Sequence, residues 1–120
     1  MRMQIWPAGV ILVELPDEPE TSNALESVIR RVLDRDDCDV VVDFSKVTIV
    51  TSKSIAPLLR LRELLCYHGK RLLLCGLSCS TKGVFSVTAL NGVFEFRNDK
   101  ENALAALGAP SNSQTATRII

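Results

Sequence analysis

Residues 39–69, DVVVDFSKVTIVTSKSIAPLLRLRELLCYHG, decide the fold of this chain. The stretch opens with consecutive valines at positions 40–42, and such a β-branched run is typical of a strand buried on both faces of a parallel sheet. It ends with leucines at helical spacing, followed by Gly69, a frequent left-handed residue at helix ends. The stretch therefore predicts a strand over residues 40–44 and a helix over residues 54–68.

A cluster of hydroxyl side chains lies where this strand leads into this helix, at Thr51, Ser52 and Ser54, with Lys53 among them. The first turn of a helix has free backbone N–H groups and a partial positive charge, so a phosphate is accommodated there. Ser52 suits either role, phosphoacceptor or helix cap, and Ser54 is a candidate N-cap. Thr51 is the weaker phosphoacceptor, and Lys53 is either a solvated charge or a partner for a phosphate.

The sequence before this stretch predicts a hairpin and a helix. Residues 3–6 and 10–15 read as short strands joined by a Pro-Ala-Gly turn. A helix follows, with Thr21 or Ser22 as its N-cap. Its apolar residues keep to i, i+3, i+4 spacing and predict one buried stripe. These residues are Leu25, Val28, Ile29, Val32 and Leu33.

The sequence after this stretch predicts two further βα units. Residues 72–75 form a second short apolar run, read as a buried strand, and a helix is expected over residues 80–90 with Val84, Val87 and Leu90 facing inward. A strand over residues 93–96 and a last helix over residues 100–107, capped by Asn98 or Asp99, complete the pattern. Pro57 is expected in the first turn of the central helix, where proline is tolerated.

The order of these elements predicts one α/β domain over residues 1–108. An N-terminal hairpin precedes a βαβαβα series, which gives a mixed, mostly parallel sheet with helices packed on it. Residues 109–120 are polar and aperiodic, and we expect them to be a flexible C-terminal tail.

Composition excludes several classes of function. Basic and acidic residues balance at 14 each, which argues against a protein that binds nucleic acid by neutralising phosphates. No apolar run approaches the roughly 18–20 residues of a membrane span, so we expect no direct membrane insertion. The first residues do not read as a signal peptide, and we expect a cytoplasmic location.

The chain is poorly supplied with catalytic groups and cofactor motifs. Asp43 follows a buried strand, but spacing places no second carboxylate or histidine beside it, and no glycine-rich nucleotide motif follows any strand. We therefore expect a protein that is not an enzyme and has no cofactor or metal. The four cysteines read as reduced structural thiols. The alternative is a zinc site, although its spacing matches no common zinc motif. Its ligands would be Cys66, His68, Cys75 and Cys79.

The pattern of motifs resembles the STAS domain, as in bacterial anti-sigma-factor antagonists. Residues 43–45 stand for the Asp-Leu-Ser that ends a strand of that family, and residues 51–54 for its Asp-Ser-x-Gly motif, which opens a helix. Further matches follow in order, and together they cover most of the chain from Gly9 to Leu107. They are Gly69-Lys70-Arg71-Leu72, Thr88-Ala89-Leu90 and the Ala-rich segment over residues 101–107.

The resemblance implies a partner switch. In such proteins the serine of the motif, here Ser52, is phosphorylated by a serine-kinase-type anti-sigma factor, and phosphorylation releases that partner. The interaction surface would include Thr51, Ser52, Lys53 and Ser54, together with Ser45 and Lys46 in the loop over residues 45–49, and the loop over residues 77–81. A homodimer is left open.

Three departures from the family pattern keep other functions open. The family Asp is Thr51 here, the family Gly is Ser54, and the Gly of a Thr-Gly-Leu turn is Ala89. The first change removes a carboxylate beside the phosphoacceptor. The alternative is an unphosphorylated STAS scaffold, or the soluble subunit of a membrane transport or signalling complex. A third hypothesis is a small-ligand pocket near Thr51 and Ser80.

Overall fold

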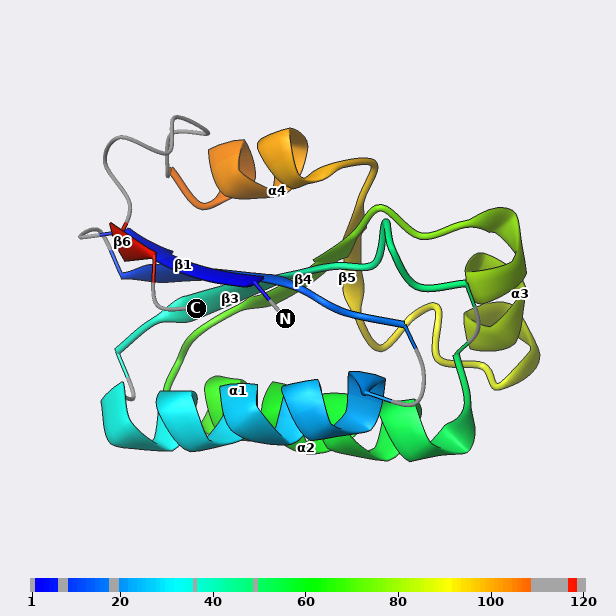
Figure 1. Cartoon of the computed structure of the whole chain (residues 1–120), viewed down its shortest axis with the longest axis horizontal. Coiled ribbons are helices and arrows are strands. Elements are labelled where there is room, and N and C mark those ends of the chain that lie inside the picture. The colour runs from blue at the N-terminus through cyan, green and yellow to red at the C-terminus, as the bar shows by residue number, and fades with distance from the viewer. Residues whose placement is uncertain are drawn as a thin grey trace.

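The computed structural model has three layers: helices α1 and α2 cover one face of a central sheet, and α4 covers the other (Figure 1). It describes residues 2–6, 9–17, 20–35, 37–48, 50–108 and 117–118. The helices are α1 (Thr21–Arg35), α2 (Ser52–Tyr67), α3 (Cys79–Val87) and α4 (Lys100–Ala106). The strands are β1 (Arg2–Trp6), β2 (Val10–Glu14), β3 (Asp39–Asp43), β4 (Leu72–Cys75), β5 (Glu95–Arg97) and β6 (Thr117–Arg118).

The sheet is mixed and its order is β5-β4-β3-β2-β1-β6. β1 and β2 form the predicted antiparallel hairpin, and β2, β3, β4 and β5 are parallel neighbours. The predicted fold class is therefore confirmed. The turn residues Pro7 and Ala8 lie outside the described part. Gly9, which follows them, has a φ of 87° and donates its N–H to the Trp6 carbonyl.

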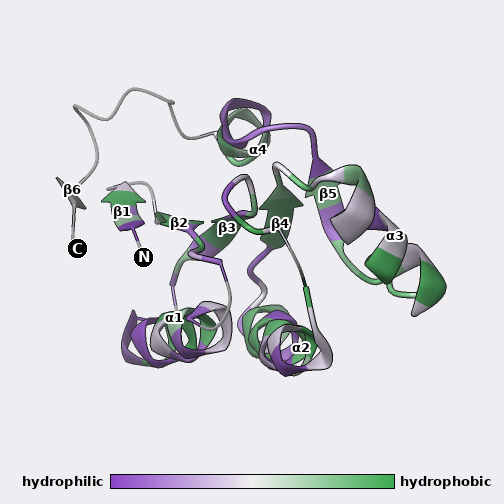
Figure 2. Cartoon of the chain, turned by 45° about the vertical axis from the view of Figure 1, so that its right-hand side comes forward, coloured by the Kyte–Doolittle hydropathy of each residue, from purple (hydrophilic) through white to green (hydrophobic). Residues whose placement is uncertain are grey.

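The valine run lies in the core, as predicted, because β3 is covered on both faces. Val40 and Val42 belong to the cluster beneath α1 and α2, whereas Val41 belongs to the smaller cluster beneath α4. All three side chains are fully buried. The central strands are mainly hydrophobic, while α1 and α2 carry both hydrophobic and hydrophilic residues around their axes (Figure 2).

Helix α1 differs from the prediction at both ends. Thr21 is its first helical residue rather than its N-cap, and its Oγ1 donates a hydrogen bond to the Pro16 carbonyl at 2.8 Å. Leu33 was expected in the buried stripe but is 59% exposed. At about 100° per residue, Leu33 lies about 80° around the axis from Leu25 and so leaves the stripe. The helix also runs to Arg35, beyond Leu33, the last residue of the predicted stripe.

Helix α2 begins two residues earlier than predicted and ends where expected. Gly69 has a φ of 70°, its N–H bonds to the Cys66 carbonyl, and the Lys70 N–H bonds to the Leu65 carbonyl at 2.8 Å. This is a Schellman end, which satisfies carbonyls of the last turn. Pro57 was expected in the first turn but is the sixth residue of α2. It therefore removes one hydrogen bond from the helix interior.

The C-terminal third contains the largest departures. Helix α3 is shorter than expected, and Val87, predicted to face inward, is 88% exposed, whereas Phe85 is buried. The strand predicted over residues 93–96 is β5 over Glu95–Arg97. It starts two residues later than predicted because the Val93 N–H is held in a turn by the Leu90 carbonyl. The predicted cap of α4 is confirmed as Asp99, whose carboxylate accepts from the Asn102 N–H.

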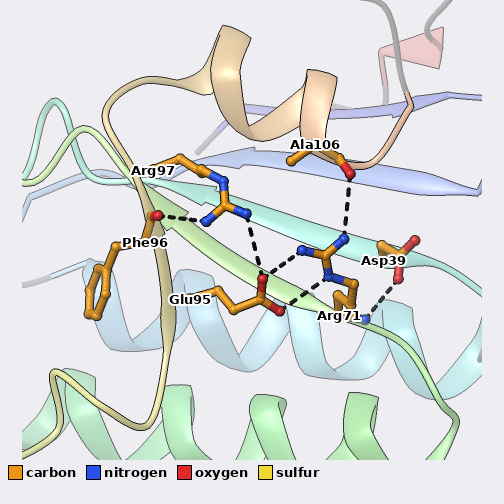
Figure 3. Close-up of polar contacts among 6 residues, drawn as sticks. All are labelled: Asp39, Arg71, Glu95, Phe96, Arg97 and Ala106. Atoms are coloured by element: carbon orange, nitrogen blue, oxygen red, sulfur yellow. Dashed lines mark hydrogen bonds and ion pairs between the residues drawn. The ribbon is translucent and has the colours of Figure 1, made fainter.

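A polar network ties this end of the chain to the sheet (Figure 3). The Arg71 guanidinium donates twice to the Glu95 carboxylate and once, at 3.4 Å, to the Ala106 carbonyl at the end of α4. The Arg71 N–H bonds to Asp39 at the start of β3. Of the predicted tail, Thr117 and Arg118 form β6 against β1. Residues 109–116 and 119–120 lie outside the described part.

Candidate functional site

The candidate site lies at the edge of the sheet where the parallel strands end. Glu14, Asp43 and Cys75 are aligned across β2, β3 and β4 in the strand register. The loops that leave β3 and β4 at this edge lead into α2 and α3, so the starts of both helices lie at the same end of the molecule (Figure 1). Parallel α/β sheets commonly place their binding sites at this edge.

Thr51 is the N-cap of α2, which corrects the expectation that Ser52 or Ser54 caps the helix. Its backbone is extended, with φ −117° and ψ 172°, and its carbonyl accepts from the N–H groups of Ser54 and Ile55. Its side chain makes no capping hydrogen bond. Instead Thr51 Oγ1 is buried without a hydrogen-bond partner in the structure. The helix start is thus held by backbone hydrogen bonds alone at this residue.

The three hydroxyls of the predicted cluster lie in different environments. Thr51 Oγ1 is buried, and Ser54 is fully buried in the first turn of α2. Ser52 is the first residue of the helix and is exposed, as is Lys53. Of these three residues only Ser52 is exposed, and it lies at the positive end of the helix dipole.

Ser45 and Lys46 lie in the loop after β3, as predicted, but their roles differ. Both residues are exposed. The Asp43 carboxylate, 5% exposed, accepts from the Ser45 N–H and the Ser45 hydroxyl, both at 3.0 Å. Ser45 Oγ is thus committed to bracing the loop. Lys46 makes no ion pair within the described residues, so its ammonium is free to meet an acidic partner.

Gly76 allows this brace to form. Its φ is 69°, and a Cβ at this position would lie 2.4 Å from Asp43 Oδ1 and 3.1 Å from the Ser45 backbone nitrogen. The loop after β4 therefore approaches the loop after β3 as closely as only glycine permits. The sequence motif showed the Asp43–Ser45 pair but not this contact, which joins residues far apart in the chain.

A second brace connects the loop before α1 to the loop before α2. Asp17 accepts from both the backbone N–H and the side-chain hydroxyl of Thr48. The two residues are 31 positions apart, so no local sequence pattern indicates the pairing. In the other predicted loop, Ser78 is the N-cap of α3 and its hydroxyl accepts from the Thr81 N–H. Ile49, also named in the predicted surface, lies outside the described residues.

The cysteines do not assemble into the alternative zinc site. Cys66 lies near the end of α2, before β4 begins, and Cys79 lies at the start of α3, after β4 ends. Both cysteines are exposed. Cys75 is buried in β4, and burial raises the pKa of its thiol to about 12. Among the residues that the structure describes, no three His, Cys, Asp or Glu side chains lie close enough to hold a metal ion.

Comparison with protein families identifies the chain. A model of the STAS domain matches residues 19–103. The chain belongs to the STAS domain family. The match spans α1, β3, α2, β4, α3 and β5, so it includes Asp43, Ser45 and Gly76 of the first brace and the exposed Ser52. The predicted resemblance is confirmed, and the motif departures at Thr51, Ser54 and Ala89 occur inside a genuine STAS domain.

Solved structures share the fold of this STAS domain. An anti-sigma-factor antagonist (STAS) domain protein from Planctomyces limnophilus has a TM-score of 0.77 at 20% identity, over 90% of this chain and 98% of that one. The Bacillus cell fate determinant SpoIIAA in its phosphorylated form has a TM-score of 0.66 at 14% identity, over 88% and 96%. A sulfate transporter family protein from Wolinella succinogenes has a TM-score of 0.67 at 22% identity, over 87% of this chain and 88% of that one.

Two further comparisons gave negative results. No curated protein matched the sequence significantly. None of the helices described is both long and apolar enough to cross a bilayer. At these levels of identity the solved structures establish the fold.

Proposed function

We propose that this STAS domain is a non-enzymatic, protein-binding regulatory module, switched by phosphorylation of Ser52. Its partner is a serine-kinase-type anti-sigma factor or a related regulatory protein, met in the cytoplasm. The observation that carries the proposal is the separation of the three hydroxyls: Thr51 Oγ1 and Ser54 are buried, whereas Ser52 is exposed at the first position of α2. A kinase therefore has one accessible acceptor at this helix start.

The physical chemistry of the site suits a switch that leaves the fold intact. A phosphate adds about −1.5 to −2 charges at pH 7, and at the start of α2 these charges meet free N–H groups and the positive end of the dipole. Lys46 and Lys53 are both exposed and lie on either side of Ser52 in the sequence. The same charge in a docked interface costs desolvation and repels acidic groups, so phosphorylation weakens binding.

A second candidate is supported by the similarity to the sulfate transporter family protein. In this alternative the chain is an unphosphorylated scaffold or the soluble subunit of a membrane transport or signalling complex. Thr51 in place of the family Asp favours this alternative, because no carboxylate stands beside the acceptor to help a kinase dock. Neither candidate requires a nucleic-acid partner, and both are compatible with a homodimer.

Mass spectrometry of the protein recovered from its own host separates the two candidates. We expect intact-mass and fragmentation spectra to show one phosphate, on Ser52. We also expect Ser52→Asp to weaken binding to the captured partner by more than tenfold, or about 1.4 kcal/mol, with an unchanged circular dichroism spectrum. Ser22→Asp, which places the same charge in the first turn of α1, is the matched control and should retain binding. A protein that stays unmodified in growing and stressed cells would favour the transport or scaffold alternative.

A further inference from the structure

Helix α3 is the most lightly packed helix of the domain. It lies beside β5 at the margin of the sheet rather than over either face (Figures 1 and 2). Only Thr81 and Phe85 of its nine residues are buried. Phe85 meets Phe44, Phe94 and Phe96 edge-on, with ring centroids 6.4, 5.7 and 5.5 Å away. One aromatic side chain thus provides most of the attachment of this helix.

A cavity of about 240 Å³ lies beside that attachment point, lined by Lys82, Phe85, Ser86, Asn91 and Phe96. Its surface is mostly apolar. Phe96 is partly exposed there, whereas Phe85 is only 1% exposed. Pockets for drug-sized ligands measure roughly 300–1,000 Å³, so this cavity suits a body the size of a single ring.

Three polar side chains line this cavity without a hydrogen-bond or ion-pair partner among the described residues. The side chains of Lys82, Ser86 and Asn91 make no hydrogen bond or ion pair within the described part of the chain, and Lys82 and Ser86 stand one helical turn apart on α3. An ammonium, a hydroxyl and an amide together supply donors, one of them charged, beside a mostly apolar space. A carboxylate is the group that such a set of donors complements best.

We propose that this cavity binds a small monocarboxylate with an aromatic ring as its body. The ring of the ligand packs against the partly exposed Phe96, and its carboxylate is met by Lys82 with Ser86 or Asn91. The proposal is independent of Ser52 phosphorylation and of the identity of the protein partner. It places the ligand beneath α3, whose Phe85 also contacts Phe44 in the loop that leads to α2.

Phenylacetate is the probe for this proposal, added to the ¹⁵N-labelled full chain while amide resonances are followed. With ten non-hydrogen atoms it should bind with a Kd of ~1–10 mM. We expect saturable shifts centred on Lys82, Phe85, Ser86, Asn91 and Phe96. Acetate lacks the aromatic ring, and 2-phenylethanol lacks the carboxylate. Each should bind at least fivefold more weakly than phenylacetate.

Variants separate a specific site from surface association. Lys82→Gln should weaken phenylacetate binding at least fivefold. Lys70→Gln, at a lysine just beyond α2 that has no ion pair among the described residues, should leave the Kd unchanged. Both lysines lie at the surface, and amide spectra verify that each variant is folded. Non-saturable shifts, shifts centred elsewhere, or equal binding by wild type and Lys82→Gln would each overturn the proposal.

Discussion

Among single residues, Ala89 adopts the backbone conformation least suited to its side chain. Its φ is 60°, in the left-handed region, and it is the one described non-glycine residue there. A left-handed alanine costs about 1–2 kcal/mol, whereas glycine pays only the added flexibility of its unfolded state, about 0.4–1 kcal/mol. The family Gly of the Thr-Gly-Leu turn has been replaced at the position where glycine has a physical advantage.

Ala89→Gly should therefore stabilise the domain by about 0.5–1 kcal/mol, because the exposed Ala89 side chain contributes no burial that would be lost. Urea denaturation measures the change. Ala56→Gly is the matched control: Ala56 is exposed in the interior of α2, where glycine should destabilise by about 1 kcal/mol. Equal destabilisation by both substitutions would show that the turn at Ala89 carries no strain.

Between secondary-structure elements, the Arg71–Glu95 pair links β4 to β5 and predicts a pH dependence. Hydrogen bonding by Arg71 lowers the pKa of Glu95 below its usual value, and the positive charges of Arg71 and Arg97 act in the same direction. A lowered folded-state pKa means that the stabilisation is complete above the unfolded pKa, about 4.3. It is lost as the pH falls through the folded-state pKa.

Glu95→Gln should therefore destabilise the domain at pH 7 and make little difference at pH 3. The loss at pH 7 should stay below about 1 kcal/mol, because the side chains of Arg71 and Glu95 are 42% and 43% exposed. Urea midpoints of wild type and variant at the two pH values provide the test. Glu63→Gln, an exposed glutamate of α2 with no ion pair among the described residues, should show no such difference. A constant effect at both pH values would exclude the ion pair as its cause.

For the molecule as a whole, how much the sequence could predict depends on how each element is buried. The valine run and Gly69 predicted β3 and the end of α2 because burial on two faces and a left-handed end each leave a local pattern. The buried face of α3 was predicted wrongly. Val84, Phe85 and Val87 are all apolar, and in so short a helix their spacing does not decide which of them faces inward. The motif predicts Ser52 as a phosphoacceptor, which stays a prediction. The burial of Ser54 and the Asp17–Thr48 brace depend on contacts between distant residues.

The same distribution of burial predicts an order of local opening. β3 and β4 carry fully buried side chains on both faces, such as Val41 and Val42 in β3, whereas α3 is held by Thr81 and Phe85. Amides of β3 and β4 should exchange only through global unfolding, and amides of α3 through a local opening of lower free energy. Native-state hydrogen exchange by NMR, at several low denaturant concentrations, measures both. If the α3 amides instead share the free energy and denaturant dependence of β3, the helix opens only with the whole domain, because its single aromatic anchor is bound as firmly as the sheet.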